Sequence, residues 1–262
     1  MSRPKPVSSL PTPPKSAHAL LSYSIRVQTF GLYLLFPLLF SLLIPLFRSL
    51  WKSPSSVGAV RLEGLFYLSE SLLILLWCLF YLHYRHKRED EQRAMSLLAV
   101  SKELGFRASQ PLKLIVRGAF AYPLILSPMV IMVALGNWIF QRYTTPAHPL
   151  SLSFMLLESR WDWALLFVQT AVMAPLVEET LFRGVLYPAL RERWGVWGGI
   201  ALSSAIFAIL HPNMPAGFLP LFVLGAGMAI LYERNRSLLP AMVLHAINNG
   251  FILVIQYLTL NR

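Results

Sequence analysis

Polar side chains capable of acid–base chemistry lie inside three apolar stretches of the sequence. They are Glu178, Glu179 and Arg183 in VQTAVMAPLVEETLFRGVLYPAL, His211 at the end of FAILH, and His245, Asn248 and Asn249 in HAINN. An ionisable group in lipid costs several kcal/mol unless it is paired or lines a wet cavity. These residues are therefore candidates for a functional site rather than for ordinary packing.

Helical spacing separates the two adjacent carboxylates. Glu179 and Arg183 are four residues apart with the acid first, which is the favourable order for an ion pair on one helix face. Glu178 is turned about 100° away from Glu179, so its carboxylate is left for chemistry. His245 and Asn249 are also four residues apart and share a face.

The depth of these groups along their helices permits one shared site. At about 1.5 Å per residue, Glu178 lies roughly 20 Å from the loop at Arg191, and His211 and His245 fall at overlapping levels. A carboxylate can act as a general base, and a neutral imidazole can help it to activate a water. A second imidazole and an amide can donate hydrogen bonds to a developing oxyanion. Such a set suffices to hydrolyse an amide bond without a serine or cysteine nucleophile.

The composition excludes most soluble classes of protein. Apolar residues make up 56% of the 262 residues and charged residues 13%, about half of the roughly 25% usual in soluble domains. This high hydrophobicity also excludes a disordered chain. The single cysteine, Cys78, excludes an internal disulfide, a multi-cysteine zinc site and an iron–sulfur cluster. The net charge of +11 comes from basic residues between apolar runs, as in cytoplasmic loops, so no nucleic-acid partner is expected.

Seven apolar runs predict membrane-spanning helices. They are residues 27–47, 62–84, 112–140, 161–190, 196–210, 218–232 and 238–258. About 20 apolar residues are needed to cross a bilayer, and the fifth and sixth runs are shorter than that. The pattern predicts an all-α fold, a polytopic transmembrane helix bundle of about seven to eight spans.

Three regions follow from this pattern. Residues 1–25, with five prolines, are expected to form a disordered cytoplasmic tail. Residues 26–150 are expected to hold the N-terminal spans with a basic cytoplasmic segment near 85–111, and residues 151–262 the membrane core that carries the candidate site. Loops on one side of the membrane contain 16 Lys and Arg and those on the other side 5, which places the N-terminus in the cytoplasm. We expect a multi-pass protein of the bacterial inner membrane.

Three motifs link the candidate residues to a known family. EETLFR fits the pattern EExxxR, FAILH fits FxxxH and HAINN fits HxxxN, in this order along the chain. Over roughly residues 160–260 the sequence resembles the CPBP (Abi) family of intramembrane proteases, which includes the CAAX prenyl endopeptidase. The resemblance implies a helical bundle with a conical cavity inside the membrane, open to the lipid and to the cytoplasm.

The resemblance also implies a role for the residues at each motif position. Glu178 would activate the attacking water with help from His211. His245 and Asn249 would form the oxyanion hole for the tetrahedral intermediate.

Glu179 and Arg183 occupy the remaining motif positions, and the resemblance implies that they support the site. No cofactor and no metal are expected, because the resemblance is to glutamate-dependent members of the family. A metal held by Glu178, His211 and His245 is the alternative within the same family.

The sequence thus predicts an intramembrane endopeptidase that hydrolyses a peptide bond of a membrane-associated protein or peptide in the lipid bilayer. A non-enzymatic immunity or scaffolding protein that binds a peptide or partner is the main alternative. A proton-coupled carrier is a third, since intramembrane Glu and His also serve in proton relays. No inverted repeat in the sequence favours the carrier. No segment specifies a prenyl pocket or an oligomeric state.

Overall fold

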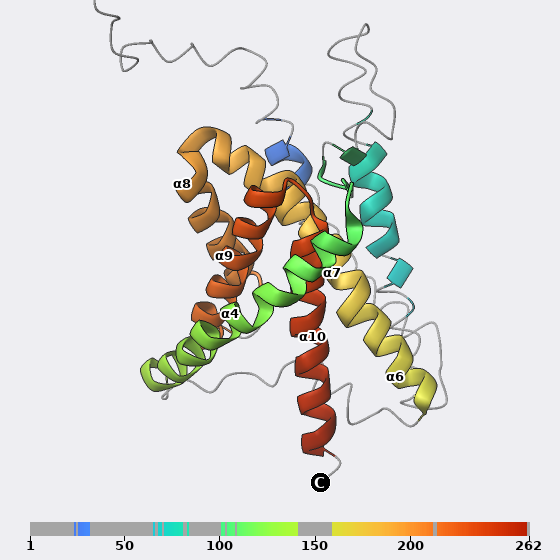
Figure 1. Ribbon diagram of the computed structural model, residues 1–262, viewed down its shortest axis with the longest axis vertical. Coiled ribbons are helices and arrows are strands. Elements are labelled where there is room, and N and C mark those ends of the chain that lie inside the picture. Colours follow the sequence, from blue (N-terminus) through green and yellow to red (C-terminus); the bar gives the residue numbers. More distant parts are fainter. Residues whose placement is uncertain are drawn as a thin grey trace, which may run out of the picture.

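The computed structural model of the protein describes residues 24, 26–31, 65, 68–69, 71–80, 83, 101–102, 104–107, 109–140, 159–211 and 214–260. Within this part of the chain every element is a helix (Figure 1). Of the predicted first span, residues 27–31 are described. The predicted tail, apart from residue 24, and most of the basic segment near 85–111 lie outside the described residues.

The elements that surround the candidate site are α-helices and two π-helical segments. They are α4 (Pro111–Ile139), α6 (Arg160–Phe167), η3 (Val168–Met173), α7 (Ala174–Glu179), η4 (Thr180–Leu186), α8 (Tyr187–Ile209), α9 (Phe218–Asn235) and α10 (Leu239–Leu260). At Gly195 the backbone turns to φ 72°, which breaks the helix, and α8 bends back along the bundle (Figure 1). The predicted runs 161–190 and 196–210 are the two arms of this bend.

Three stretches are long and apolar enough to cross a membrane by length and composition, namely Pro111–Ile139, Arg160–Ile209 and Leu239–Thr259. Large apolar side chains cover the outer surface of α4, and those more than 70% exposed are Leu112, Phe120, Leu124 and Trp138. A continuous apolar surface of this kind suits lipid rather than water. The chain is a helical membrane protein, and the count of seven to eight spans stays a prediction.

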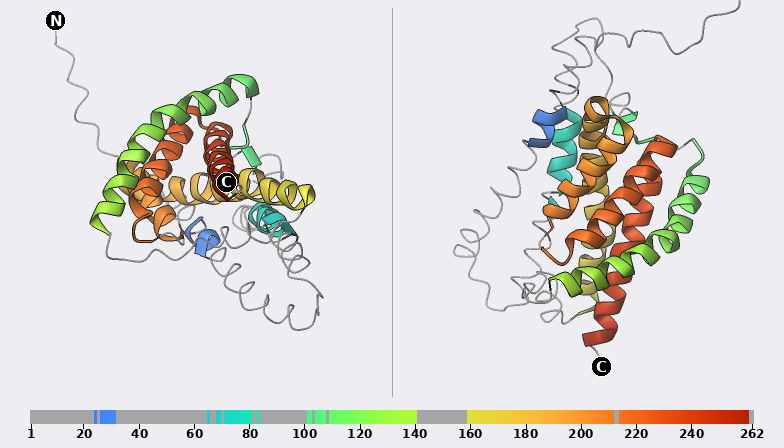
Figure 2. Two further views of the ribbon diagram at one scale, coloured as in Figure 1. Left: turned by 90° about the horizontal axis from the view of Figure 1, so that it is seen from below. Right: turned by 90° about the vertical axis from the view of Figure 1, so that its left-hand side faces the viewer.

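The helices pack around a core that adjoins the candidate site. Its side chains with at most 1% exposure include Phe207, Leu224, Met228 and Leu244. α4 crosses α9 and α10 obliquely and contacts both (Figure 2). Gly118 permits this approach, because a Cβ atom there would lie 2.5 Å from the Pro240 carbonyl oxygen of α10.

A proline in the long helix leaves one carbonyl group without a helical donor. In η3 the Ala174 N–H bonds to the Gln169 carbonyl, five residues back. The next residue, Pro175, has no N–H to donate. The Thr170 carbonyl therefore needs a partner from outside its own helix, because a buried carbonyl without a hydrogen bond is costly.

The close contact between α4 and α10 predicts the effect of a small substitution. We expect Gly118→Ala to destabilise the protein by about 1–3 kcal/mol, since the added methyl group meets backbone atoms that cannot move aside. Thermal unfolding can be followed by reaction of the single thiol, Cys78, which is fully buried, with a fluorescent dye. Gly31→Ala is the matched control, because among the described residues a Cβ atom at Gly31 meets nothing within 4 Å. Equal thermal midpoints for Gly118→Ala and Gly31→Ala would contradict the close contact between α4 and α10.

Candidate active site

A buried ion pair lies next to the candidate site. Arg183 Nη1 lies 2.9 Å from Glu179 Oε1, and both side chains are fully buried. Arg183 Nη2 also donates to the Gly225 carbonyl of α9 at 2.9 Å. The guanidinium lies over the Phe207 ring, 4.9 Å from its centroid. One side chain of η4 is thus held by groups from α7, α8 and α9.

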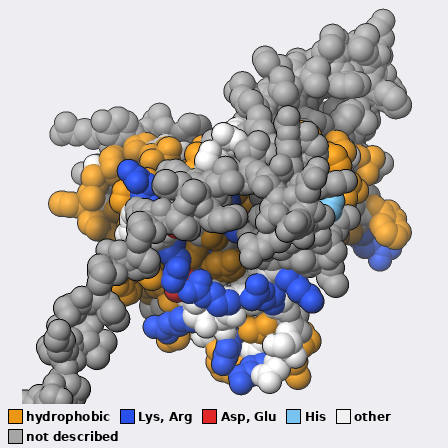
Figure 3. Space-filling model, turned by 90° about the horizontal axis from the view of Figure 1, so that it is seen from above, with side chains coloured by type: hydrophobic (Ala, Val, Ile, Leu, Met, Phe, Trp, Pro, Cys, Tyr) orange, Lys and Arg blue, Asp and Glu red, His pale blue; other side chains and the backbone are white. Residues whose placement is uncertain are grey.

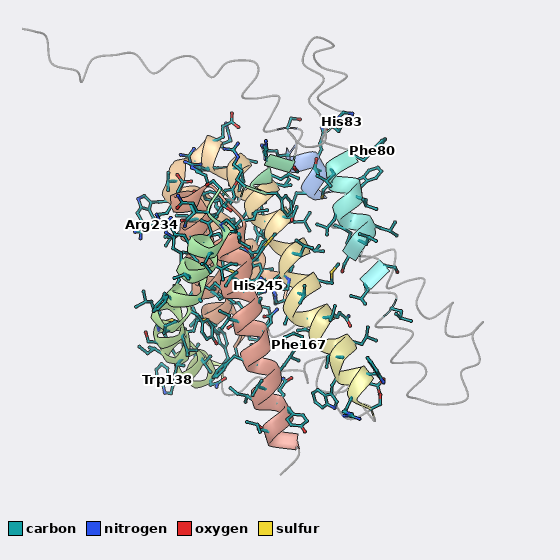
Figure 4. The ribbon with its side chains drawn as sticks, turned by 45° about the vertical axis from the view of Figure 1, so that its right-hand side comes forward. Phe80, His83, Trp138, Phe167, Arg234 and His245 are labelled. Atoms are coloured by element: carbon teal, nitrogen blue, oxygen red, sulfur yellow. The ribbon has the colours of Figure 1, made fainter. Side chains whose placement is uncertain are left out.

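Glu179 also orients the histidine of α10. His245 Nδ1 lies 2.9 Å from Glu179 Oε1, and both side chains are buried. Because a carboxylate only accepts hydrogen bonds, His245 carries a proton on Nδ1 and donates it to Glu179. Figure 4 shows His245 on α10 beside the helix that carries Glu179. The ring is fixed by this contact, and its Nε2 atom lies 3.8 Å from the neighbouring carboxylate of Glu178.

The Glu178 carboxylate lies between two imidazole rings. Glu178 Oε2 is 3.8 Å from His211 Nε2 and 3.8 Å from His245 Nε2. These distances are too long for direct hydrogen bonds, and they are short enough for one water molecule to bridge. Among the described residues, the buried Oε2 atom has no hydrogen-bond partner. Glu178 is therefore the carboxylate that lines the pocket with an acceptor still available.

The FxxxH spacing determines which nitrogen of His211 faces Glu178. His211 Nδ1 lies 2.6 Å from the Phe207 carbonyl oxygen, one helical turn earlier. That carbonyl is accessible because α8 tightens at its end, where the His211 N–H bonds to Ala208 instead. A carbonyl only accepts, so Nδ1 is protonated and the neutral ring presents the lone pair of Nε2 toward Glu178.

Asn249 satisfies the carbonyl that the proline left free. Its Nδ2 atom donates to the Thr170 carbonyl at 2.9 Å, which joins α10 to η3. Asn248 Nδ2 donates to Asn249 Oδ1 at 3.3 Å. With its oxygen and one N–H engaged, the Asn249 amide has a defined orientation and a second N–H left to donate.

These groups line one pocket of about 330 Å³. Glu178, His211, His245 and Asn249 all contribute to its wall, whereas Glu179 and Arg183 lie buried behind it. The pocket also has polar lining residues that the sequence did not single out, namely Gln169, Thr170 and Gln256. Gln256 could have been found, because it follows Asn249 by seven residues and so shares its helix face.

The pocket adjoins an apolar surface groove of about 290 Å³ between α6 and α10. Leu253 borders both, and the groove is further lined by Trp163, Phe167 and Tyr257. Within the described part of the chain, no group of three His, Cys, Asp or Glu side chains is arranged to hold a metal ion.

The segment that builds this site matches a known family. Residues 160–251 match the model described as type II CAAX prenyl endopeptidase Rce1-like, which confirms the predicted resemblance for this segment. The range contains all of the motif residues.

Two curated proteins are similar to part of the chain. One is "Putative membrane peptidase YdiL" of Bacillus subtilis (strain 168), 27% identical over 92 residues, which cover 35% of this chain and 37% of that protein. The other is a 24.3 kDa protein of Escherichia coli, 31% identical over 104 residues, which cover 38% of this chain and 48% of that protein. The chain thus matches less than half of the length of these relatives. No solved structure matches the chain.

The buried ion pair predicts a large loss of stability when its cation is removed. We expect Arg183→Met to destabilise the protein by about 3–5 kcal/mol, because the charge of Glu179 would be left buried without its cation. The double variant Glu179→Gln/Arg183→Met should lose less stability, since neither member of the ion pair is then left as an unpaired buried charge. Thermal unfolding followed by the Cys78 thiol measures both, with the exposed Arg193→Met as control. A double variant no more stable than Arg183→Met would contradict this explanation.

Proposed function

We propose that the protein is an intramembrane endopeptidase that hydrolyses a peptide bond of a membrane-associated protein or peptide. The match of residues 160–251 to the Rce1-like family supports a membrane peptidase. The observation that carries the proposal is the position of Glu178 Oε2, 3.8 Å from the Nε2 atoms of both His211 and His245. The apolar groove beside the pocket agrees with a substrate that is presented from the membrane.

In the proposed reaction, a water molecule lies between Glu178 and His211. It donates one hydrogen bond to Glu178 Oε2 and one to the Nε2 lone pair of His211, so a lone pair of its oxygen is directed at the scissile carbonyl carbon. As the new C–O bond forms, Glu178 takes a proton from the water. The carbonyl oxygen becomes the oxyanion of the tetrahedral intermediate.

His245 and Asn249 would stabilise that oxyanion. His245 already donates its Nδ1–H to Glu179, so its Nε2 donates only in the imidazolium form, whose charge Glu178 and Glu179 would balance. Asn249 would contribute the N–H that Thr170 does not use. When the intermediate collapses, the C–N bond breaks and the leaving amine takes the proton held by Glu178. The products are a carboxylic acid and an amine, and Glu178 is again a carboxylate.

Substitution of the proposed general base tests this mechanism. We expect Glu178→Gln to lower the cleavage rate by about 10²–10⁴-fold, the usual contribution of a general base. Its thermal midpoint should stay near that of the wild type, because Glu178 Oε2 has no hydrogen bond to lose among the described residues. The substrates are quenched peptides anchored by an acyl or a prenyl chain, and the products are identified by mass spectrometry. Glu192→Gln, an exposed carboxylate on α8, is the control.

The same assay separates the alternatives. Full cleavage by Glu178→Gln would overturn the mechanism, and cleavage by the wild type that a chelator abolishes would assign the chemistry to a metal. A cellular phenotype that survives Glu178→Gln would favour the non-enzymatic immunity or scaffolding protein. Comparison of the acyl and prenyl anchors shows whether the enzyme prefers a prenylated substrate.

The two adjacent asparagines provide a test of the oxyanion hole. We expect Asn249→Ala to lower kcat by about 10²–10³-fold with little change in KM, as removal of one oxyanion donor does. Asn248→Ala is the matched control, because it leaves the bond between Asn249 and Thr170 in place. Asn248→Ala should lower kcat much less than Asn249→Ala does. Equal losses in kcat for the two variants would show that Asn249 has no special role at the oxyanion.

A further inference from the structure

A second pocket, of about 270 Å³, lies where the first arm of α8 meets the end of α9. Five basic side chains line it, namely Arg26, Lys102, Arg107, Arg191 and Arg236. No acidic residue is among its described lining residues, and it shares no lining residue with the pocket that contains Glu178. Figure 3 shows Lys and Arg side chains gathered on one end of the molecule. We call this pocket the basic cavity.

Among the described residues, one carboxylate neighbours the basic cavity. Glu233 lies 3.0 Å from Arg191 Nε and 2.7 Å from Arg236 Nη2. It also accepts a hydrogen bond from the Tyr187 hydroxyl at 2.7 Å. Arg191 and Arg236 thus share one carboxylate with a tyrosine. Several cations around one small cavity repel each other, and a bound anion would remove that repulsion.

The wall of the basic cavity is held in place by backbone contacts. Leu238 N–H donates to the Gly105 carbonyl at 2.9 Å, and Arg107 Nε donates to the Lys102 carbonyl at 2.8 Å. Gly105 has φ +102° and packs so closely that a Cβ atom would lie 2.8 Å from Tyr232 Cε2. Lys102 and Arg107 are therefore anchored through backbone contacts beside the end of α9.

Arg26 is held by a backbone carbonyl of η4. Its Nη1 atom donates to the Gly184 carbonyl at 2.7 Å, and the side chain is 8% exposed. This contact gives the Arg26 guanidinium a defined position in the wall of the basic cavity.

From this arrangement we infer that the basic cavity binds a phosphate group, either of a phospholipid headgroup or of a soluble phosphate compound. Phosphate oxygens accept several charge-assisted hydrogen bonds, and guanidinium groups bind them in pairs. A phosphate carries more charge than a single carboxylate, which suits four arginines and a lysine. All five residues belong to segments that the distribution of Lys and Arg assigns to the cytoplasmic surface, where anionic lipids attract basic groups.

Binding to the delipidated full-length protein in non-ionic detergent tests this inference. Native mass spectrometry would measure retention of phosphatidylglycerol, and titration calorimetry would measure binding of inorganic phosphate. We expect one molecule per cavity, with affinity lowered at least about tenfold in Lys102→Gln/Arg107→Gln. Lys113→Gln/Arg234→Gln is the matched control, since both residues are exposed and neither lines the cavity (Figure 4 labels Arg234).

The outcomes of this experiment are distinct from those of the protease assay, because the measurement is binding and not cleavage. Stronger retention of phosphatidylglycerol than of inorganic phosphate identifies a lipid headgroup, and the reverse identifies a soluble phosphate. Either result supports the inference when Lys102→Gln/Arg107→Gln binds the ligand more weakly and Lys113→Gln/Arg234→Gln does not. Absence of both ligands from the wild type, equal binding by the two double variants, or displacement of phosphate by an Asp-rich peptide at lower concentration would overturn it.

Discussion

The structure depends on how one fully buried carboxylate is stabilised. Glu179 Oε1 accepts from both Arg183 and His245, and all three side chains are buried. A charge in such a place is costly unless its partners are held in good geometry. Arg183 in turn requires the Gly225 carbonyl, so the ion pair is complete only when α7, α9 and α10 are docked together. The same contacts that make the buried charge tolerable also position the ring of His245 in the pocket.

Two adjacent glutamates on one helix therefore have different roles. The side chain of Glu179 is fully buried, and its Oε1 atom accepts from Arg183 and His245. Glu178, about 100° further round the helix, faces the pocket and keeps a free acceptor among the described residues. A general base cannot be held in a structural ion pair. Here Glu179 forms the ion pair with Arg183, so Glu178 does not.

Side chains from distant segments bond to backbone carbonyls of the long, irregular helix. Pro175 removes a backbone donor, and Asn249 reaches the Thr170 carbonyl at the candidate active site. Arg26 reaches the Gly184 carbonyl of η4 beside the basic cavity. Irregular helix geometry thus directs polar groups into a bundle whose outer surface is apolar.

The sequence by itself determined the membrane class, the motif residues and two of the relations that lie within one helix. The ion pair of Glu179 with Arg183 and the separate orientation of Glu178 follow from a period of about 3.6 residues per turn. The link from His245 to Glu179, the link from Asn249 to Thr170 and the position of Glu178 near both imidazoles were decided by the tertiary structure. The gathering of Arg26, Lys102 and Arg107 into one cavity was also decided by the tertiary structure. These relations join different helices, and their distances depend on how side chains interlock across the bundle, which local spacing does not encode.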